Sequence, residues 1–455
     1  MLRVKIPQAN LEELLFKLRN EPSEPALVEV AENYRPEHGL FELLYHRTVG
    51  FSGLSSAWRM GSGFHPMLVR LSHSMNEFVR MRCLAEARNL DKGISLLFVL
   101  DGGNLQVFFA GPLTQHFGEQ ACLNMPGPFM ESLRLSVIKE KQGRAIMSGV
   151  AADPEPTPEQ ARTDEFEQFK GRYERLAGAI GKGKVEAGLD LMLKARKLKI
   201  MVVGAGRAGS WLAYRLAECG IGSEGGLVIV DPDVVEESNL PDMHVPAGAV
   251  GWQKAEAVAA TIMAMVPGSH PVPFSSGLDT EEVVNELCTS DVVFTAVDED
   301  SARLGVAILA ARYHLLQIDV SGGCSWISRD VAEVGGELRI FVPGTPGCLG
   351  CMTKTNLRDA EHLLMANVQQ ERERRAQLDW RETKAGSSAD ILFPVLGEAV
   401  QSFWAILSGE LRHSVWWHYS KGRNGMPVWE DWSNKRSWRR CRICSHQAGL
   451  GDLVI

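Results

Sequence analysis

The stretch IMVVGAGRAGS, residues 200–210, constrains the fold of this chain more than any other segment. It begins with apolar residues typical of a buried strand and continues through a glycine-rich turn into a sequence that favours a helix. Gly204, Gly206 and Gly209 fit the pattern GxGxxG, which allows a tight turn and brings backbone N–H groups close to a phosphate. The stretch predicts a nucleotide site, but this pattern alone fits NAD and ATP equally.

Apolar segments and helix-forming segments alternate from Lys199 onward. Because a strand must cross over a helix to pair in parallel with the next strand, this alternation predicts a doubly wound, largely parallel, Rossmann-like sheet. The expected strands are KIMVV (199–203), GLVIV (226–230), DVVFTAV (291–297) and LLQIDVS (315–321), and the expected helices cover 210–219, 254–265 and 301–313.

The rest of the chain predicts a second, separate domain. Residues 1–150 show mixed helix and strand patterns without a glycine fingerprint, so we expect an α+β accessory domain of unknown fold. Three prolines among small and acidic residues in AADPEPTPEQ favour an extended linker at 151–162. The doubly wound domain then covers 163–455, with a helical stretch over 163–197 and a crossover segment at 352–395.

Composition excludes several classes of protein. The chain is 45% hydrophobic and 23% charged, its net charge is −8, and no apolar run reaches the roughly 20 residues that span a bilayer. The N-terminus lacks the apolar core and cleavage site of a signal peptide. We therefore expect a cytoplasmic protein that binds neither membranes nor nucleic acids in general, and we interpret the basic run NKRSWRRCR (434–442) as solvated.

The segments downstream of the glycine turn are more specific than the turn itself. They read DPDVVEESNLPDMHV (231–245), VGWQKAEA (250–257), TAVDEDSAR (295–303) and GGELRIFVPGTPGCLGC (335–351), with CRIC at 441–444. In this order they resemble the ThiF/MoeB/ubiquitin-activating superfamily over about residues 169–444. The resemblance implies an adenylyltransferase that uses ATP and Mg²⁺ to activate the C-terminal glycine of a ubiquitin-like or sulfur-carrier protein. We expect a bacterial ubiquitin-like-protein-activating member.

The same resemblance implies roles for individual residues. Asp231 would hold the ribose, Asn239 would lie beside the phosphates, Lys254 would contact the phosphates, and Asp298 would organise Mg²⁺. Arg303 matches an arginine that follows this aspartate in the family. GRYERL (171–176) resembles a helix whose arginine, here Arg175, often reaches across a homodimer to the γ-phosphate. A homodimer is therefore expected.

Elementary chemistry supports two of these roles independently. Attack of a carboxylate on the α-phosphate joins two anions, so the site needs a metal, a carboxylate that holds it, and fixed cations. Asp298 and Lys254 can supply the carboxylate and the cation. An NAD-dependent oxidoreductase, the alternative for the glycine turn, needs a proton-relay residue near the nicotinamide, and no histidine, lysine or tyrosine stands out in that role.

One position departs from the family. The family has an arginine in the motif NLxRQ, whereas this chain has Asp242 in NLPDMH, where an acid would repel a triphosphate. Either another cation such as Arg207 compensates, or ATP turnover is weakened. An inactive scaffold that binds a ubiquitin-like partner is therefore one alternative function, and a peptide- or tRNA-modifying adenylation enzyme of the same superfamily is another.

Four of the nine cysteines form two CxxC pairs, Cys348 with Cys351 and Cys441 with Cys444. Four thiolates at this spacing can close a tetrahedral Zn²⁺ site, which would be structural because no position stays open. A redox role is the alternative for either pair alone.

Between Met352 and Arg440 the chain has no cysteine, so we expect no enzyme thioester on the crossover segment. The remaining cysteines are Cys83, Cys122, Cys219, Cys288 and Cys324, of which Cys324 follows a central strand near the expected nucleotide site.

His65 and His73 could suggest a metalloprotease-type site in the N-terminal region. No accompanying aspartate pattern or upstream glutamate is evident, so we interpret both as ordinary histidines.

Overall fold

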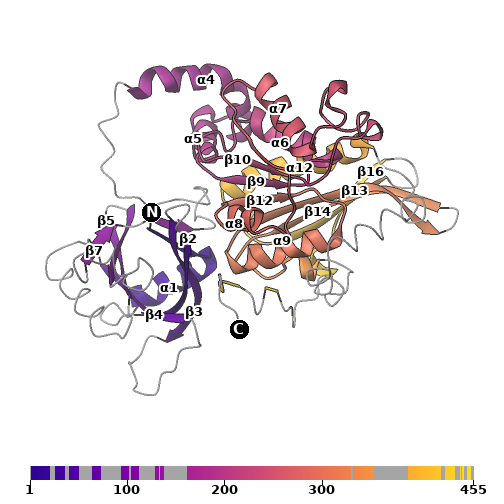
Figure 1. Cartoon of the computed structure of the whole chain (residues 1–455). Coiled ribbons are helices and arrows are strands. Elements are labelled where there is room, and N and C mark those ends of the chain that lie inside the picture. The colour runs from indigo at the N-terminus through magenta and orange to yellow at the C-terminus, as the bar shows by residue number, and fades with distance from the viewer. Residues whose placement is uncertain are drawn as a thin grey trace.

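The computed structural model describes two eight-stranded sheets, which lie in separate parts of the chain (Figure 1). The described residues are 2–20, 26–35, 40–50, 64–72, 94–101, 104–111, 129–132, 134–137, 161–328, 331–352, 388–421, 426–435, 441, 443–444 and 448–451. The predicted linker and most of the crossover segment lie outside these residues, so the domain boundaries stay predictions.

The first sheet is mixed and has the strand order β7-β6-β5-β4-β2-β3-β1-β8. Helix α1 (Gln8–Asn20) buries Leu11, Leu14 and Leu18, whose spacing of three and four residues places them on one helical face. The strands are β1 (Leu2–Ile6), β2 (Ala26–Arg35), β3 (Leu40–Gly50), β4 (Phe64–Ser72), β5 (Ile94–Asp101), β6 (Asn104–Gly111), β7 (Phe129–Ser132) and β8 (Arg134–Val137). The expectation of a separate α+β domain is confirmed.

The second sheet has the order β11-β10-β9-β12-β13-β14-β15-β16. The strands from β11 to β13 pair in parallel, and β14 to β16 extend the sheet by antiparallel pairing. These strands are β9 (Ile200–Val203), β10 (Leu227–Val230), β11 (Val272–Phe274), β12 (Val292–Thr295), β13 (Leu316–Ser328), β14 (Val331–Phe341), β15 (Val415–Lys421) and β16 (Pro427–Asp431). The predicted doubly wound, largely parallel sheet is confirmed, and the antiparallel extension was not predicted.

Helices cover both faces of the second sheet, because the side chains on both faces of its central strands are buried. In β9, Ile200 and Val202 pack into one hydrophobic cluster with α4, α5, α6, α7 and α12, whereas Met201 and Val203 pack into another with α8 and α9. The helices are α4 (Ala161–Ile180), α5 (Val185–Arg196), α6 (Arg207–Glu218), α7 (Lys254–Met265), α8 (Glu281–Cys288), α9 (Asp300–Arg312) and α12 (Ala389–Leu407). The helical stretch predicted at 163–197 is thus two helices.

Helix α12 is long and apolar enough to cross a bilayer by length and composition alone. Its side chains Leu392, Val395, Ala399 and Phe403 are buried in the core cluster that also contains α6 and β13. Its packing is that of a core helix.

Buried contacts join the two domains just before the start of β13. Lys5 Nζ donates to the Tyr313 carbonyl at 3.3 Å, and His314 Nε2 donates to the Tyr45 carbonyl at 2.8 Å. Ala31 and Leu44 of the first sheet share a hydrophobic cluster with α9. The N-terminal domain therefore packs directly on the second domain.

Buried His314 makes this junction sensitive to acid. Burial lowers the pKa of His314 to about 4, although its hydrogen bond to Tyr45 opposes the shift. The unfolded chain binds this proton from about pH 6.5 downward while the folded chain does not, so stability is complete above pH 6.5 and falls toward pH 4. The expected loss is about 3 kcal/mol, measured as the free energy of unfolding in urea at pH 7 and pH 4.

The variant His314→Asn tests this assignment, because asparagine tolerates the left-handed backbone at this residue (φ 52°). It should reduce the difference in unfolding free energy between the two pH values, whereas His413→Asn, at an exposed position, should not. An unchanged difference in His314→Asn would contradict the prediction.

Candidate functional site

The glycine turn joins β9 to α6 and leaves space on one side. Gly204 has φ 94°, and a Cβ there would lie 2.6 Å from the Ala296 carbonyl oxygen. A Cβ on Gly209 would lie 1.7 Å from the Gly204 carbonyl oxygen, so helix and turn can approach only without a side chain. A Cβ on Gly206 would meet open space. The first and third glycines are required by packing, and the second faces the side from which a phosphate could approach the N-terminus of α6.

Asp231, at the end of β10, fixes the shape of this turn. Its side chain accepts hydrogen bonds from the backbone N–H of Ala205 at 2.6 Å and of Asp233 at 2.9 Å. Burial raises the pKa of Asp231, and these two hydrogen bonds and the charge of Lys254 oppose the rise. The residue expected to hold a ribose therefore also supports the backbone beneath it.

Lys254 is the first residue of α7 and lies among three carboxylates. Its side chain is 15% exposed, and its Nζ donates to Asp233 Oδ2 at 2.9 Å. Burial would lower the pKa of Lys254, but Asp231, the Asp233 hydrogen bond and Asp298 together raise it. The ammonium group is thus held in its charged form beside the ends of β10 and β12.

Asp298 follows β12 in an exposed turn, where a cation could reach its carboxylate from solvent. Arg303 of α9 supports this turn from the interior, since its guanidinium donates to the Val297 carbonyl and to Asp319 Oδ1. Asp319 is fully buried and also accepts from Arg339 Nη1 at 2.9 Å. The structure brings Asp231, Lys254 and Asp298 together at one edge of the sheet.

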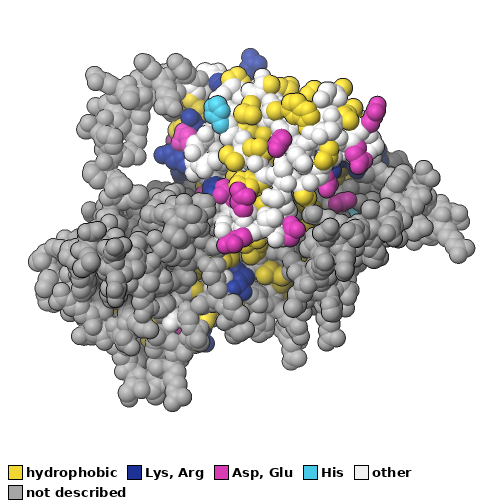
Figure 2. Space-filling model, viewed as in Figure 1, with side chains coloured by type: hydrophobic (Ala, Val, Ile, Leu, Met, Phe, Trp, Pro, Cys, Tyr) yellow, Lys and Arg dark blue, Asp and Glu magenta, His cyan; other side chains and the backbone are white. Residues whose placement is uncertain are grey.

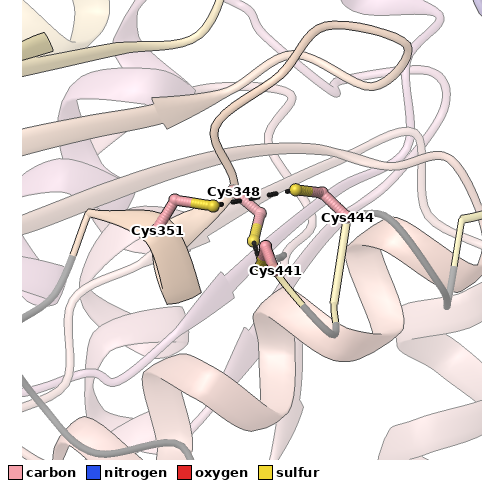
Figure 3. Close-up of side chains that lie close together, drawn as sticks. All are labelled: Cys348, Cys351, Cys441 and Cys444. Atoms are coloured by element: carbon pink, nitrogen blue, oxygen red, sulfur yellow. Dashed lines mark hydrogen bonds between the residues drawn. The ribbon is translucent and has the colours of Figure 1, made fainter. Parts of the chain in front are cut away.

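The four cysteines of the two CxxC pairs converge on one point (Figure 3). All four sulfur atoms lie within 4.8 Å of one another, with 3.4 Å between Cys348 and Cys441 and 3.7 Å between Cys351 and Cys444. Sulfurs that bind one Zn²⁺ at about 2.3 Å in a tetrahedron lie about 3.8 Å apart. Hydrogen bonds in which the Cys348 thiol donates to the neighbouring cysteine sulfurs raise the pKa of Cys348, because clustered thiols cannot all ionise without a cation. The donor set and its geometry fit zinc.

The ThiF family matches residues 182–402. This part of the chain is a ThiF-family domain. The chain is 29% identical over 193 residues to "Adenylyltransferase and sulfurtransferase UBA4" of Yarrowia lipolytica, covering 42% of this chain and 45% of that protein. It is 32% identical over 155 residues to the "SAMP-activating enzyme E1" of Haloferax volcanii, covering 34% and 53%.

A bacterial relative is the "ATP-dependent ubiquitin transferase-like protein Cap2" of Enterobacter hormaechei, which is 29% identical over 114 residues, covering 25% of this chain and 18% of that protein. The chain spans about half the length of the first two relatives and less of the third.

Asn239, Arg303 and Arg175 have contacts or positions in the structure that their expected roles did not include. Asn239 Oδ1 accepts from the Glu236 N–H at 3.1 Å and so caps a short 3₁₀ helix, Glu237–Asn239. Arg303 is buried against Asp319, and Arg175 is exposed on α4. Their roles toward a nucleotide stay predictions.

Asp242, the residue that departs from the family motif, forms an ion pair with Arg207. Its Oδ2 accepts from Arg207 Nε at 2.9 Å, and its Oδ1 accepts from the Ala389 N–H at 3.2 Å. The cation expected to compensate for this acid therefore lies directly beside it. Sequence reasoning missed the contact with Ala389 and the buried Asp319–Arg339 pair; the signal for the latter was an acid inside the apolar strand LLQIDVS.

The remaining candidates are His65, His73 and the cysteines outside the cluster. His65 lies in β4, and His73, Cys83 and Cys122 lie outside the described residues. Cys219 and Cys288 are buried, and burial raises the pKa of Cys219 to about 11.

Proposed function

We propose that this chain uses ATP to adenylate the C-terminal glycine of a ubiquitin-like or sulfur-carrier protein. The observation that carries the proposal is the group formed by Asp231, Lys254 and Asp298 beside the glycine turn of a ThiF-family domain. The names of the relatives, an adenylyltransferase and a SAMP-activating enzyme, support the same reaction.

In the proposed reaction, a carboxylate oxygen of the carrier attacks the α-phosphorus of ATP, and pyrophosphate leaves with its bonding electrons. Lys254 places a fixed positive charge where negative charge accumulates, and the N–H groups at the start of α6 face the phosphates. Asp298 would hold Mg²⁺, which supplies electrostatic stabilisation of the leaving pyrophosphate. Asp231 would keep the glycine turn in shape while it binds the ribose.

The surface near Lys254 supports a protein partner. Figure 2 shows hydrophobic side chains on the face of the ThiF-family domain that carries α6 and α7 in Figure 1. Exposed hydrophobic residues near Lys254 include Val250, Trp252 and Val234, which forms a β-bridge with Gln253. Trp252 is 53% exposed only two residues before Lys254. A carrier that docks through an apolar surface could insert a glycine tail, since only glycine passes close to the α-phosphate without side-chain clashes.

Four finer statements belong to the same proposal. The carrier would act in a bacterial ubiquitin-like conjugation pathway, which the bacterial relative supports, and the N-terminal domain would serve recognition or assembly. The enzyme would be a cytoplasmic homodimer in which Arg175, exposed on α4, is available to the second copy. The adenylate would pass directly to a thiol on a partner, since among described cysteines outside the cluster only Cys324 of β13 is not buried.

The test is exchange of labelled pyrophosphate into ATP with Mg²⁺ and a ubiquitin-like protein ending in Gly-Gly from the same genome. Exchange should require the carrier and disappear when the carrier lacks its last glycine, because the carboxylate of the shortened tail would no longer reach the α-phosphorus. A non-reducing gel of the same mixture should show no enzyme–carrier band. Exchange that is independent of the carrier tail would contradict the adenylation proposal, and a reductant-sensitive band lost in Cys324→Ala would contradict direct transfer.

A further inference from the structure

Arg207 lies where a phosphate would approach. It is the first residue of α6 and follows Gly206, the residue that precedes the helix and faces open space. Its side chain is 34% exposed and its Nε donates to Asp242 Oδ2. A partly exposed cation thus lies beside the N–H groups that the fold presents to a nucleotide.

Asp242, by contrast, is held from several directions. Its carbonyl oxygen accepts from Trp211 Nε1 at 2.9 Å, and its Oδ1 accepts from the Ala389 N–H in the first turn of α12. Two residues later, the His244 N–H donates to Ser210 Oγ at 3.0 Å, and the His244 ring packs on Trp211 with 4.1 Å between ring centroids. Segment 242–244 is therefore fixed on α6, and Arg207 is the partner that can move.

The charges near the turn indicate where Arg207 would move. Lys254 is already balanced by Asp231, Asp233 and Asp298, so a bound triphosphate needs further positive charge. A partly exposed ion pair such as Arg207–Asp242 is weak, whereas arginine and phosphate form strong bidentate hydrogen bonds. If Arg207 leaves, Oδ1 of Asp242 keeps the Ala389 N–H at the positive end of α12, and water can replace Arg207 at Oδ2 because the side chain is partly exposed.

We propose that Arg207 contacts the phosphates of ATP and that Asp242 is its positioning residue, which competes with the nucleotide for this arginine. The proposal rests on the proposed use of ATP. Asp242 therefore lowers ATP affinity through Arg207 and not by repelling the phosphates itself. The acid at this position and the arginine in the glycine turn act as one unit that replaces a single phosphate-binding arginine.

The test is the Kd of Mg·ATP, measured by calorimetry without any carrier. Arg207→Gln should raise Kd about tenfold, the loss expected for one charge-assisted contact, and Arg207→Lys should lie between it and the wild type. Asp242→Asn keeps an acceptor for Ala389 but binds Arg207 less strongly, so Kd should fall about threefold. In the double variant Arg207→Gln, Asp242→Asn, Kd should equal that of Arg207→Gln. Arg215→Gln, an exposed arginine of the same helix, is the matched control and should not change Kd.

Two results would overturn the inference. One is an unchanged Kd in Arg207→Gln when its melting temperature matches the wild type. The other is a lower Kd from Asp242→Asn in the Arg207→Gln background, which would mean direct repulsion. If Arg207→Gln does not fold, the effect of Asp242→Asn on Kd is measured in the wild-type and Arg207→Lys backgrounds. An effect of the same size in both backgrounds would overturn the inference. A wild-type chain that does not bind Mg·ATP would instead contradict the proposed function.

Discussion

Replacing Asp298 with alanine is expected to lower carrier-dependent pyrophosphate exchange by about 10²-fold or more. The carboxylate of Asp298 lies in an exposed turn after β12 and contributes to the charge around Lys254. Its loss would remove both the proposed metal ligand and one of the negative charges that balance Lys254. The measurement is the initial exchange rate at saturating ATP and Mg²⁺.

The folded state should tolerate this change, because the turn is supported from behind. Arg303 donates to the Val297 carbonyl and is anchored on buried Asp319, and neither contact uses the Asp298 side chain. Asp279→Ala, at another exposed aspartate of the same domain, serves as the control and should keep the wild-type rate. Exchange at the wild-type rate in a folded Asp298→Ala variant would exclude the proposed role of this residue.

Local patterns were sufficient to predict four of the five parallel strands of the second sheet, β9, β10, β12 and β13, but not the short strand β11. The helix expected at 254–265 is α7 (Lys254–Met265), and the helix expected at 301–313 is α9 (Asp300–Arg312). Both follow strands whose apolar runs are buried on both faces, so the change from strand to helix is visible in the sequence. The antiparallel strands β14 to β16 were not predicted, because β14 pairs with β15 across residues 342–414 and no local signal specifies that partner.

Some contacts of the candidate site could likewise be predicted from the sequence, and others could not. Asp231 and Asp298 follow neighbouring parts of the sheet, and the carboxyl ends of parallel strands share one edge, so their meeting with Lys254 could be predicted. The pairing of Asp242 with the start of α12 could not, since Ala389 is 147 residues away in sequence. Asp319 within an apolar strand indicated a buried acid that needs a cation, but the sequence did not identify Arg303 and Arg339 as its partners.

Removing the cysteine cluster is expected to have the second large effect, on stability and metal content together. Cys348 and Cys351 lie around a short helix after β14, and Cys441 and Cys444 belong to the C-terminal segment. Beyond Cys444, this segment contacts both domains: the Ala448 carbonyl accepts from His46 Nδ1, and the Gly451 carbonyl accepts from Arg312 Nε. A metal at the cluster would therefore tie the end of the chain to the junction between the two domains.

Cys441→Ser should lower bound zinc well below the expected one equivalent per chain, because serine is a poor zinc ligand, and metal binding is coupled to folding. The melting temperature should fall by about 5 °C or more, since each kcal/mol lost corresponds to about 2–4 °C in a domain of 150–250 residues. Elemental analysis and thermal unfolding of the same samples measure both quantities.

Cys324→Ser, at a half-buried cysteine of β13 outside the cluster, should retain full zinc. The double variant Cys348→Ser, Cys441→Ser removes one ligand from each pair, and full zinc retention in that protein would exclude the site. A normal melting temperature despite lost zinc would show instead that the C-terminal segment is held by its contacts with His46 and Arg312 without the metal.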